Sequence, residues 1–239
     1  MMDRIDEYNQ QCEGKTAEEI IGYVINTLGK TVTLASSLGA EDQVLTAILG
    51  NSFSSVKVFV LDTGRLNQET YDVLEKTRKK YALSFTVFCP HAQSVQALMT
   101  EKGPNSFYES IENRKECCAI RKVEPLSRAL SGFDAWITGL RRGQSVTRVQ
   151  LPIIEWDEAH QMLKINPLAN WTERQVWDYI KAHAIPTNAL HQKGYPSIGC
   201  EPCTRAIKAG EDLRAGRWWW ETPDQKECGL HPSGSKEGS

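Results

Sequence analysis

Short apolar runs alternate with helical patterns along much of the chain, and this alternation limits the possible folds more than any other feature. Runs with the composition of buried strands occupy residues 31–35, 56–61, 84–88 and 135–138. Helical patterns follow the first two runs, at residues 41–49 and 67–81. Strands that alternate with helices predict an α/β fold with a parallel sheet.

Two further helices are indicated by their first residues. Thr16 with Glu19, and Thr172 with Gln175, have the spacing of a capping box, in which each side chain satisfies a backbone N–H at the helix start. The first box opens a helix over residues 16–28, and the second opens a structural helix.

Three of the predicted strands end in polar segments that contain glycine. These segments are Ser36–Gly39, Asp62–Arg65 and Gly139–Arg142. Ligands of open parallel sheets bind beyond the carboxyl ends of the strands, so we expect a binding site there. The first segment leads into a helix, where free backbone N–H groups and the helix dipole favour an anion, although an ordinary turn has the same pattern. No dinucleotide fingerprint or nucleotide phosphate loop is present.

Composition excludes several classes of protein. The chain has 239 residues and a net charge of −2, so it has no general attraction for nucleic acid or for an anionic membrane. No apolar run is long enough to span a bilayer, and the polar, acidic start is unlike a signal peptide. A cytoplasmic location is the expectation.

Cysteine spacing predicts a metal or iron–sulfur site. Seven cysteines are an odd number, which argues against a closed disulfide framework. Cys200 and Cys203 form a C-x-x-C pair, and the adjacent Cys117 and Cys118 complete a set of four thiols. Such a set suits zinc or an iron–sulfur cluster. For the adjacent pair, a vicinal disulfide or simple burial is the alternative. Lys122 lies near enough to offset cluster charge or to hold an anionic substrate.

The other three cysteines receive different interpretations. Cys89 ends an apolar run and is predicted to be a small buried residue, whereas Cys12 is placed in a polar leader. Cys228 has Lys226 and His231 close in the sequence, which favours a reactive thiolate; a surface thiol on a frayed end is the alternative.

Arginines precede a run of tryptophans near the end of the chain. Arg214 and Arg217 are followed by Trp218–Trp220. Such a pattern occurs at sites where bases stack, but the net charge argues against nucleic acid, and a core or an interface is the better interpretation.

These residues carry a resemblance to a known family. The chain resembles the assimilatory adenylyl-sulfate (adenosine 5′-phosphosulfate) reductases of the phosphoadenylyl-sulfate reductase family along nearly its whole length. The similarity rests on the following segments: residues 37–42, 61–66, 114–118 with Arg121 and Lys122, 139–141, 144–148, 199–205, 214–221 and 227–231. The two cysteine pairs together with the terminal Glu-Cys-Gly-Leu-His are the most specific of these. Family members that lack the four cysteines typically reduce the 3′-phosphorylated substrate.

The resemblance implies a fold, a cofactor and a set of roles. It implies a Rossmann-like, adenine nucleotide alpha hydrolase-like core over residues 1–232 as a single domain, with a cluster-binding and catalytic C-terminal segment at about 206–232 and a flexible tail at 233–239. A 4Fe-4S cluster would be held by Cys117, Cys118, Cys200 and Cys203. The adenylate pocket would be lined by Ser37, Gly39, Leu61, Thr63 and Gly139. The phosphosulfate would be surrounded by Lys122, Arg148, Arg214 and Arg217.

The implied reaction is the reduction of adenosine 5′-phosphosulfate to sulfite and AMP through an S-sulfocysteine on Cys228, with His231 in the same catalytic segment. Thioredoxin or glutaredoxin would be the reductant, and the enzyme would be a homo-oligomer that serves sulfate assimilation and cysteine biosynthesis. Two alternatives stay open: a reductase of the 3′-phosphorylated substrate, and a non-catalytic four-cysteine zinc or iron–sulfur protein.

Overall fold

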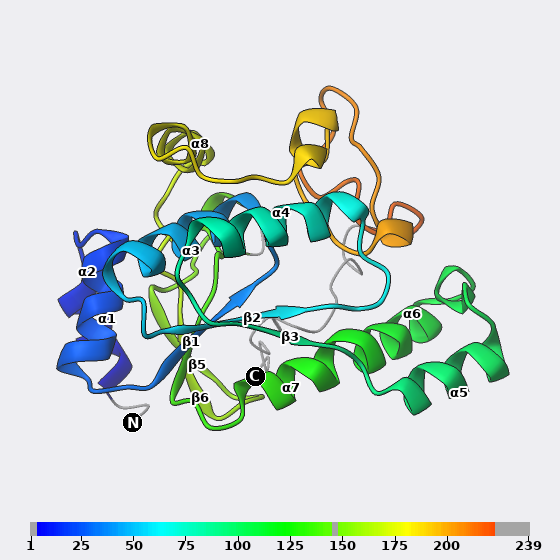
Figure 1. Cartoon of the computed structure of the whole chain (residues 1–239), viewed down its shortest axis with the longest axis horizontal. Coiled ribbons are helices and arrows are strands. Elements are labelled where there is room, and N and C mark those ends of the chain that lie inside the picture. Colours follow the sequence, from blue (N-terminus) through cyan, green and yellow to red (C-terminus); the bar gives the residue numbers. More distant parts are fainter. Residues whose placement is uncertain (1–3, 145–147, 223–239) are drawn as a thin grey trace, which may run out of the picture. The chain divides into compact units, whose positions relative to one another are not determined.

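A six-stranded, mostly parallel sheet in the order β3-β2-β1-β4-β6-β5 organises the chain (Figure 1). The computed structural model describes residues 4–144 and 148–222. Strand β1 pairs in parallel with β2 and with β4, and β4 pairs in parallel with β6, whereas β5 is antiparallel to β6. The strands are β1 (Val32–Ser36), β2 (Lys57–Leu61), β3 (Phe85–Phe88), β4 (Ala135–Ile137), β5 (Ile154–Asp157) and β6 (Met162–Ile165). The predicted α/β fold is confirmed.

Contacts divide the chain into two compact units, which are described separately. The first unit comprises residues 1–60, 68–86 and 130–189, and the second comprises residues 61–67, 87–129 and 190–239. The helices of the first unit are α1 (Ile5–Cys12), α2 (Ala17–Gly22), α3 (Ala40–Ser52), α4 (Gln68–Lys80) and α8 (Glu173–Ala182). Those that begin in the second unit are α5 (Ala92–Lys102), α6 (Ile111–Cys118) and α7 (Glu124–Leu130).

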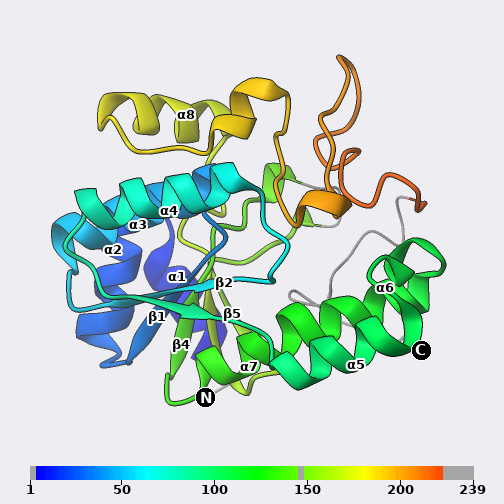
Figure 2. The same ribbon diagram turned by 45° about the vertical axis from the view of Figure 1, so that its right-hand side comes forward.

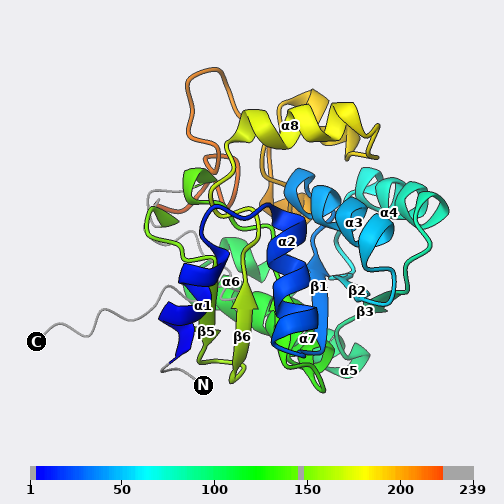
Figure 3. The same ribbon diagram turned by 90° about the vertical axis from the view of Figure 1, so that its left-hand side faces the viewer.

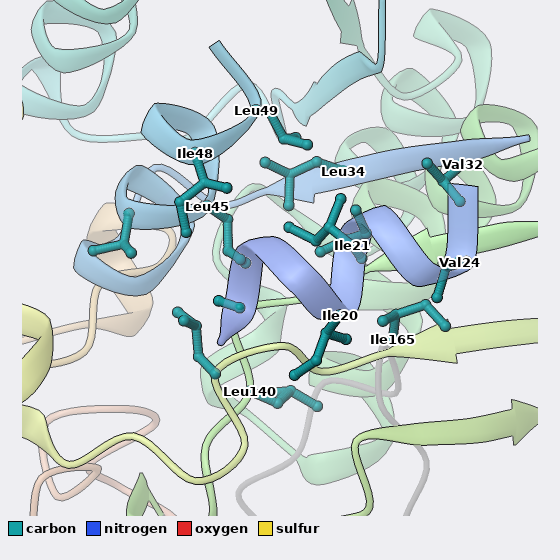
Figure 4. Packing of buried hydrophobic residues seen from close by; sticks show 14 of the residues in the cluster. Ile20, Ile21, Val24, Val32, Leu34, Leu45, Ile48, Leu49, Leu140 and Ile165 are labelled. Carbon is teal, nitrogen blue, oxygen red and sulfur yellow. The ribbon is translucent and has the colours of Figure 1, made fainter. Parts of the chain in front are cut away.

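The core of the first unit is built by α1, α2, α3 and α8 together with the sheet. Figure 4 shows Ile20 and Ile21 of α2 packed among Leu34 of β1 and Leu45 of α3. Each of these four side chains is at most 2% exposed. Burying an aliphatic side chain of this size stabilises the fold by about 1.5–3 kcal/mol, so this contact region fixes α2 and α3 against the sheet.

Both predicted capping boxes are present. The Thr16 side chain accepts from the Glu19 N–H at 3.2 Å, and the Glu19 carboxylate accepts from the Thr16 N–H at 2.8 Å. Thr172 and Gln175 form the same reciprocal pair at the start of α8. The helix predicted over 16–28 continues from α2 as a π-helical turn, Tyr23–Thr27.

The amino-terminal segment is helical, and here the structure corrects the prediction for Cys12. Cys12 lies at the end of α1 and is completely buried, one turn after the buried Tyr8. Burial raises the pKa of its thiol to about 11. On the same helix, the Asn9 side chain donates to the Ile154 carbonyl at 2.7 Å and accepts from the Ile154 N–H at 3.0 Å, so α1 satisfies backbone groups of the edge strand β5 (Figure 3).

The prediction for Cys89 is also wrong, because Cys89 is exposed. Strand β3 lies at the edge of the sheet, and its central residues Thr86 and Val87 are exposed while Phe85 and Phe88 are half-buried. An apolar run on an edge strand therefore does not bury the residue that follows it.

Helices α5 and α6 of the second unit are tied together near the end of α5 (Figure 2). The Lys102 ammonium lies 2.6 Å from the Glu116 carboxylate and donates to the Asn113 side chain at 3.2 Å. Helix α6 begins at Ser110, whose hydroxyl accepts from the Asn113 N–H. After Cys118 the chain makes a π-helical turn, Ala119–Val123, before α7. None of the helices in the described ranges has the length and hydropathy needed to cross a membrane.

Candidate active site

The loop after β1 is closed by its own side chains. The Ser37 N–H donates to Asp42, the Leu38 N–H to the Ser36 hydroxyl and the Gly39 N–H to the Ser37 hydroxyl, at 2.7, 3.2 and 3.4 Å. Leu38 has a φ of 62°, a left-handed conformation that is uncommon for leucine. The prediction of free backbone N–H groups is therefore wrong for these three residues. The hydroxyls and the start of α3 remain as groups that could contact a ligand.

Asp42 links two strand-end loops of the first unit. One of its oxygens accepts from the Ser37 N–H and, at 2.5 Å, from the Ser37 hydroxyl. The Gly139 N–H, in the loop after β4, also donates to Asp42. Because the Ser37 hydroxyl donates its hydrogen bond to Asp42, the lone pairs of the Ser37 oxygen are left to accept hydrogen bonds from other donors. Asp42 thus fixes both the position and the polarity of Ser37.

Gly139 must be glycine because α3 lies against it. A Cβ at this position would meet the Glu41 Cβ at 2.9 Å and the Asp42 backbone nitrogen at 3.2 Å. Beside this contact, Arg141 forms an ion pair with Glu41 at 2.7 Å, with its side chain only 4% exposed. Arg148 donates to the Gln144 side-chain oxygen at 2.7 Å, in the segment that follows this loop.

We expect Gly139→Ala to destabilise the protein by about 1–3 kcal/mol, because the added methyl group forces the loop away from α3. The free energy of unfolding in urea measures this effect. Gly143→Ala is the matched control: its Cβ would meet no heavy atom closer than 3.7 Å, so its effect should be within about 0.5 kcal/mol. Equal effects of the two substitutions would contradict the packing argument.

The second prediction concerns pH. Burial raises the pKa of Asp42 from 3.8 to about 6, although the hydrogen bonds from Ser37 and Gly139 act in the opposite direction. The folded protein therefore binds a proton at Asp42 more tightly than the unfolded chain does. The stability that this proton contributes is complete below about pH 4 and is lost as the pH rises through 6.

We expect wild type to lose up to about 3 kcal/mol of unfolding free energy relative to Asp42→Asn as the pH rises from 4 to 7. The comparison with the variant cancels the contributions of other carboxyl groups. A difference that stays constant over this range would show that Asp42 titrates normally.

Four cysteines of the second unit pack into one cluster. Cys118, Cys200 and Cys203 are 7–9% exposed and lie with Phe107 and Trp218, and the half-buried Cys117 packs against them. All four are free thiols. The end of α6, which carries Cys117 and Cys118, and the short 3₁₀ turn Glu201–Cys203 thus bring together two pairs that are distant in sequence.

Cations and a hydroxyl surround Cys200. The Thr63 hydroxyl lies 3.2 Å from its sulfur. Burial acts to raise the pKa of Cys200, but Lys122, Thr63, Arg217 and Arg121 outweigh it, so that the pKa falls below its ordinary value. Cys203 has fewer such neighbours, and burial together with the adjacent Cys200 raises its pKa to about 12. One edge of the cluster is therefore electropositive.

The four packed thiols are of a type that suits either an iron–sulfur cluster or a zinc ion. Around one zinc the sulfurs would be about 3.8 Å apart, as Zn–S bonds of about 2.3 Å require. No three His, Cys, Asp or Glu side chains within residues 4–144 and 148–222 are placed to hold one ion. A four-iron cluster distributes its thiolates over four metal atoms and needs a wider spacing. The buried Trp218 Nε1 has no hydrogen-bond partner in the described part of the chain, and it supplies a donor at the edge of this cluster.

The position of the Arg217 side chain depends on a neighbouring glycine. Arg217 is 7% exposed, stacks 4.7 Å from the Trp218 ring and donates to the Ile198 carbonyl at 3.3 Å. A Cβ at Gly199 would meet the Arg217 Cζ at 2.6 Å, so any other residue there would displace the guanidinium from its present position. Arg214 lies in the turn just before, where its N–H donates to Asp212 and its carbonyl accepts from the Arg217 N–H.

The predicted site residues therefore fall into two groups. The first unit contains Ser37, Gly39, Gly139 and Arg148. The second contains Leu61, Thr63, Lys122, Arg214, Arg217 and the four cysteines. Cys228 and His231 lie outside the described residues. The three tryptophans differ in environment: Trp218 is buried, Trp220 is half-buried and Trp219 is 39% exposed.

Sequence reasoning assigned no role to Asp42, Arg121 or Arg114. Asp42 and Arg121 belong to the segments that carry the resemblance, but only the structure shows that Asp42 holds Ser37 and that Arg121 donates to the Thr63 carbonyl at 2.7 Å. The position of Asp42 five residues after Ser37, in the first turn of a helix, is the local signal that could have been used.

The parallel sheet and the polar loops at its strand ends define a class of α/β protein that includes adenine nucleotide alpha hydrolase-like enzymes. A flavin mononucleotide adenylyltransferase from Candida glabrata has the same fold, with a TM-score of 0.54 at 16% identity over 92% of this chain and 75% of that one. The phosphoadenosine phosphosulfate reductase domain matches residues 31–206, and the chain belongs to this family.

Similar proteins support the same assignment. The chain is 50% identical over 215 residues to an adenosine 5′-phosphosulfate reductase from Allochromatium vinosum, covering 90% of this chain and 84% of the relative. It is 55% identical over 200 residues to one from Burkholderia cepacia, covering 84% and 80%. A crystal structure of phosphoadenylyl-sulfate reductase from Candida auris, in a phosphate complex, has a TM-score of 0.74 at 28% identity, covering 87% and 98%. The suspected family is confirmed.

Proposed function

We propose that this chain reduces adenosine 5′-phosphosulfate to sulfite and AMP in assimilatory sulfate reduction, the route to cysteine biosynthesis. The observation that carries the proposal is the packed set of four free thiols with Lys122, Arg217 and Thr63 around Cys200. The four thiols fit a 4Fe-4S cluster, and several relatives about 50% identical are named as reductases of this substrate.

The adenylate would bind at the ends of the parallel strands. Ser37 offers an oxygen acceptor whose direction Asp42 fixes, and Gly39 and Gly139 would contribute backbone at the two neighbouring strand ends. Leu61 and Thr63 are the other two residues that we propose as contacts of the adenylate. This arrangement follows the general rule that ligands of such sheets bind beyond the carboxyl ends of the strands.

The phosphosulfate would be held by the cations Lys122, Arg148, Arg214 and Arg217. Guanidinium groups match the geometry of phosphate and sulfate oxygens and stabilise the negative charge that develops on the leaving AMP. The electropositive edge of the cysteine cluster, shown by the depressed pKa of Cys200, supports this role for Lys122 and Arg217.

The chemical step would be carried out by Cys228. Its thiolate attacks the sulfur of the substrate, the S–O bond to phosphate breaks, and the electron pair leaves with AMP, which gives S-sulfocysteine. A thiol of thioredoxin or glutaredoxin then attacks the Cys228 sulfur and releases sulfite, and its second thiol resolves the mixed disulfide. His231 would help to keep Cys228 ionised.

A 4Fe-4S cluster would be held by Cys117, Cys118, Cys200 and Cys203. When bound, it would supply a compact charge that tunes and positions the substrate. Cys200 and its cationic neighbours would form the side of this centre that faces the phosphosulfate. The protein would act as a homo-oligomer in the cytoplasm, where thiols stay reduced.

Metal analysis and substrate choice test the proposal together. After anaerobic purification we expect a brown protein with about four irons and four acid-labile sulfides per chain. We expect a 3′-phosphate on the substrate to lower kcat/KM at least about tenfold. A protein with one zinc and no sulfite production would support the non-catalytic alternative. Preference for the 3′-phosphorylated substrate would support the other reductase.

A further inference from the structure

The second unit contains an open pocket of about 670 Å³. Its walls come from the end of β3, with Cys89 and Pro90, from α5, with Val95 and Met99, and from the loop after β2, with Asp62. Arg121 contributes a guanidinium. Most of the lining is apolar, and the volume lies within the range of sites that bind small molecules.

Cys89 lines this pocket and is exposed. It is the exposed one among the cysteines of the described ranges, since the other five are buried or half-buried. Its backbone is held in place: the Cys89 carbonyl accepts from Arg128 Nη2 at 2.6 Å, and Arg128 is itself paired with Glu124 on α7. A fixed, accessible thiol beside a pocket has the geometry for a covalent adduct whose other half occupies the pocket.

Arg121 indicates what kind of ligand the pocket would accept. It is only 7% exposed, and its Nη1 donates to the Thr63 carbonyl at 2.7 Å. The Arg121 side chain also hydrogen-bonds to the Cys117 thiol, and its Nε, which has no partner within the described residues, is buried. A guanidinium in the wall gives the pocket a positive charge, which favours an anionic group such as a carboxylate. Asp62 lines the same pocket, so the site offers one carboxylate and one guanidinium, which complement the ammonium and carboxylate of an amino acid.

We propose that Cys89 is a site of reversible thiol modification and that this pocket accepts low-molecular-weight disulfides of the amino-acid type. The Cys89 thiolate attacks one sulfur of the disulfide, a new S–S bond forms, and the original S–S bond breaks. The departing thiolate takes up the proton that Cys89 released. The incoming disulfide is the oxidant, and an excess of the corresponding thiol reverses the step.

An adduct here would touch residues that lead to the four-cysteine cluster. Arg121 is bonded to Thr63, and the Thr63 hydroxyl lies 3.2 Å from the Cys200 sulfur. The adjacent loop is held by the Gly64 N–H, which donates to Asp62 at 2.8 Å, and by the Arg65 N–H, which donates to the Thr63 hydroxyl at 3.2 Å. A ligand that binds Asp62 and Arg121 should therefore change the rate of hydrogen exchange at the amides of Gly64 and Arg65.

The test uses the full chain, purified anaerobically, with oxidised glutathione as the probe. Peptide mass spectrometry follows the mixed disulfide at Cys89, and a synthetic peptide of residues 84–94 supplies the reactivity of the same thiol without a pocket. We compare glutathione disulfide with hydroxyethyl disulfide, which has no charges. For each sample we take the rate with glutathione disulfide divided by the rate with hydroxyethyl disulfide. We expect this ratio to be at least about tenfold higher in the protein than in the peptide, as about 1.4 kcal/mol of binding to the pocket would give.

Matched variants on α5 separate the pocket from the thiol. Gln96 lines the pocket and Gln93 does not, and both are exposed. Gln96→Trp should reduce the glutathione rate about tenfold and leave the hydroxyethyl disulfide rate within twofold, whereas Gln93→Trp should change neither. Cys89→Ser should abolish the adduct. An equal rate ratio in protein and peptide, or an adduct on another cysteine alone, would overturn the proposal.

Amide exchange gives a second outcome that does not depend on activity. In the glutathione adduct we expect changed exchange at Gly64 and Arg65, and no change in α2 of the first unit. An adduct without this change would overturn the assignment of Asp62 and Arg121 as the groups that bind the ligand. The test stays informative if the chain proves to have another substrate, because it measures neither sulfite nor AMP.

Discussion

Replacing Cys228 by serine should lower sulfite production by at least about 10³-fold, because serine cannot supply a thiolate at neutral pH. The loss should appear in kcat rather than in KM, since Cys228 would act on a substrate that other residues hold. A labelled substrate, with sulfur followed into sulfite, gives the measurement. Iron and sulfide content should stay at the wild-type level, because the four cysteines that we propose as cluster ligands do not include Cys228.

Covalent chemistry provides a separate readout for the same variant. In the absence of a thiol reductant, wild type mixed with adenosine 5′-phosphosulfate should gain one sulfonate group on Cys228 and release one AMP, which intact-mass and peptide analysis can detect. Cys228→Ser should gain none. Cys12→Ser is the control for a cysteine that plays no part: its thiol is buried in α1, and turnover should stay within about twofold. Normal turnover by Cys228→Ser would mean that the proposed nucleophile is wrong.

The sheet and its main helices could be predicted because their signals are local. β1 and β2 are short, mostly buried strands rich in β-branched residues, and the capping boxes of α2 and α8 are each contained within four residues. The hairpin formed by β5 and β6 was not predicted. Its buried core residues Ile154, Leu163 and Ile165 gain their environment from pairing with β4 and from α1, which are distant in the sequence.

Burial of single cysteines could not be predicted for a related reason. An apolar run specifies a strand, but only strand order shows whether that strand lies at the centre or at the edge of the sheet. Cys89 follows the edge strand β3 and is exposed, while Cys12 lies on a polar helix whose one apolar face is buried against the core.

The candidate site was also predictable only in part from the sequence. The four cysteines and the strand-end loops were recognisable from spacing and from residue type. The groups that hold them were not. Asp42 determines how Ser37 presents its hydroxyl, and Arg121 determines the position of the Thr63 carbonyl. The sequence offers a local signal for Asp42, which is its position in the first turn of α3 five residues after Ser37, but none for Arg121.

Arg114 and Glu221 form the most deeply buried ion pair among the ion pairs of the described residues. Arg114 Nε and Nη2 donate to the two Glu221 carboxylate oxygens at 2.9 and 2.8 Å, and the two side chains are 1% and 3% exposed. The guanidinium also lies 5.0 Å from the centre of the Trp218 ring and beside the Cys118 thiol. The pair therefore joins α6 to the segment that closes over the four cysteines.

Arg114→Leu should destabilise the protein by about 3–5 kcal/mol, because it leaves the Glu221 carboxylate buried without its cation. The double variant Arg114→Leu with Glu221→Leu should recover much of this loss, since no buried charge remains. Arg174→Leu is the matched control: its partner Asp178 is 3.4 Å away, both side chains are largely exposed, and the effect should be within about 0.5 kcal/mol.

Urea unfolding of the metal-free chains measures these effects, and iron content after anaerobic purification shows whether the cluster site survives. We expect the single Arg114 variant to retain less iron than wild type, because an unpaired, buried Glu221 carboxylate would disturb the packing of Trp218 against the cysteines. We expect the double variant to regain the iron, because it leaves no buried carboxylate without a partner. A double variant as unstable as the single one would mean that the hydrogen bonds of Arg114, including its contact with Cys118, are what hold the cysteine cluster together.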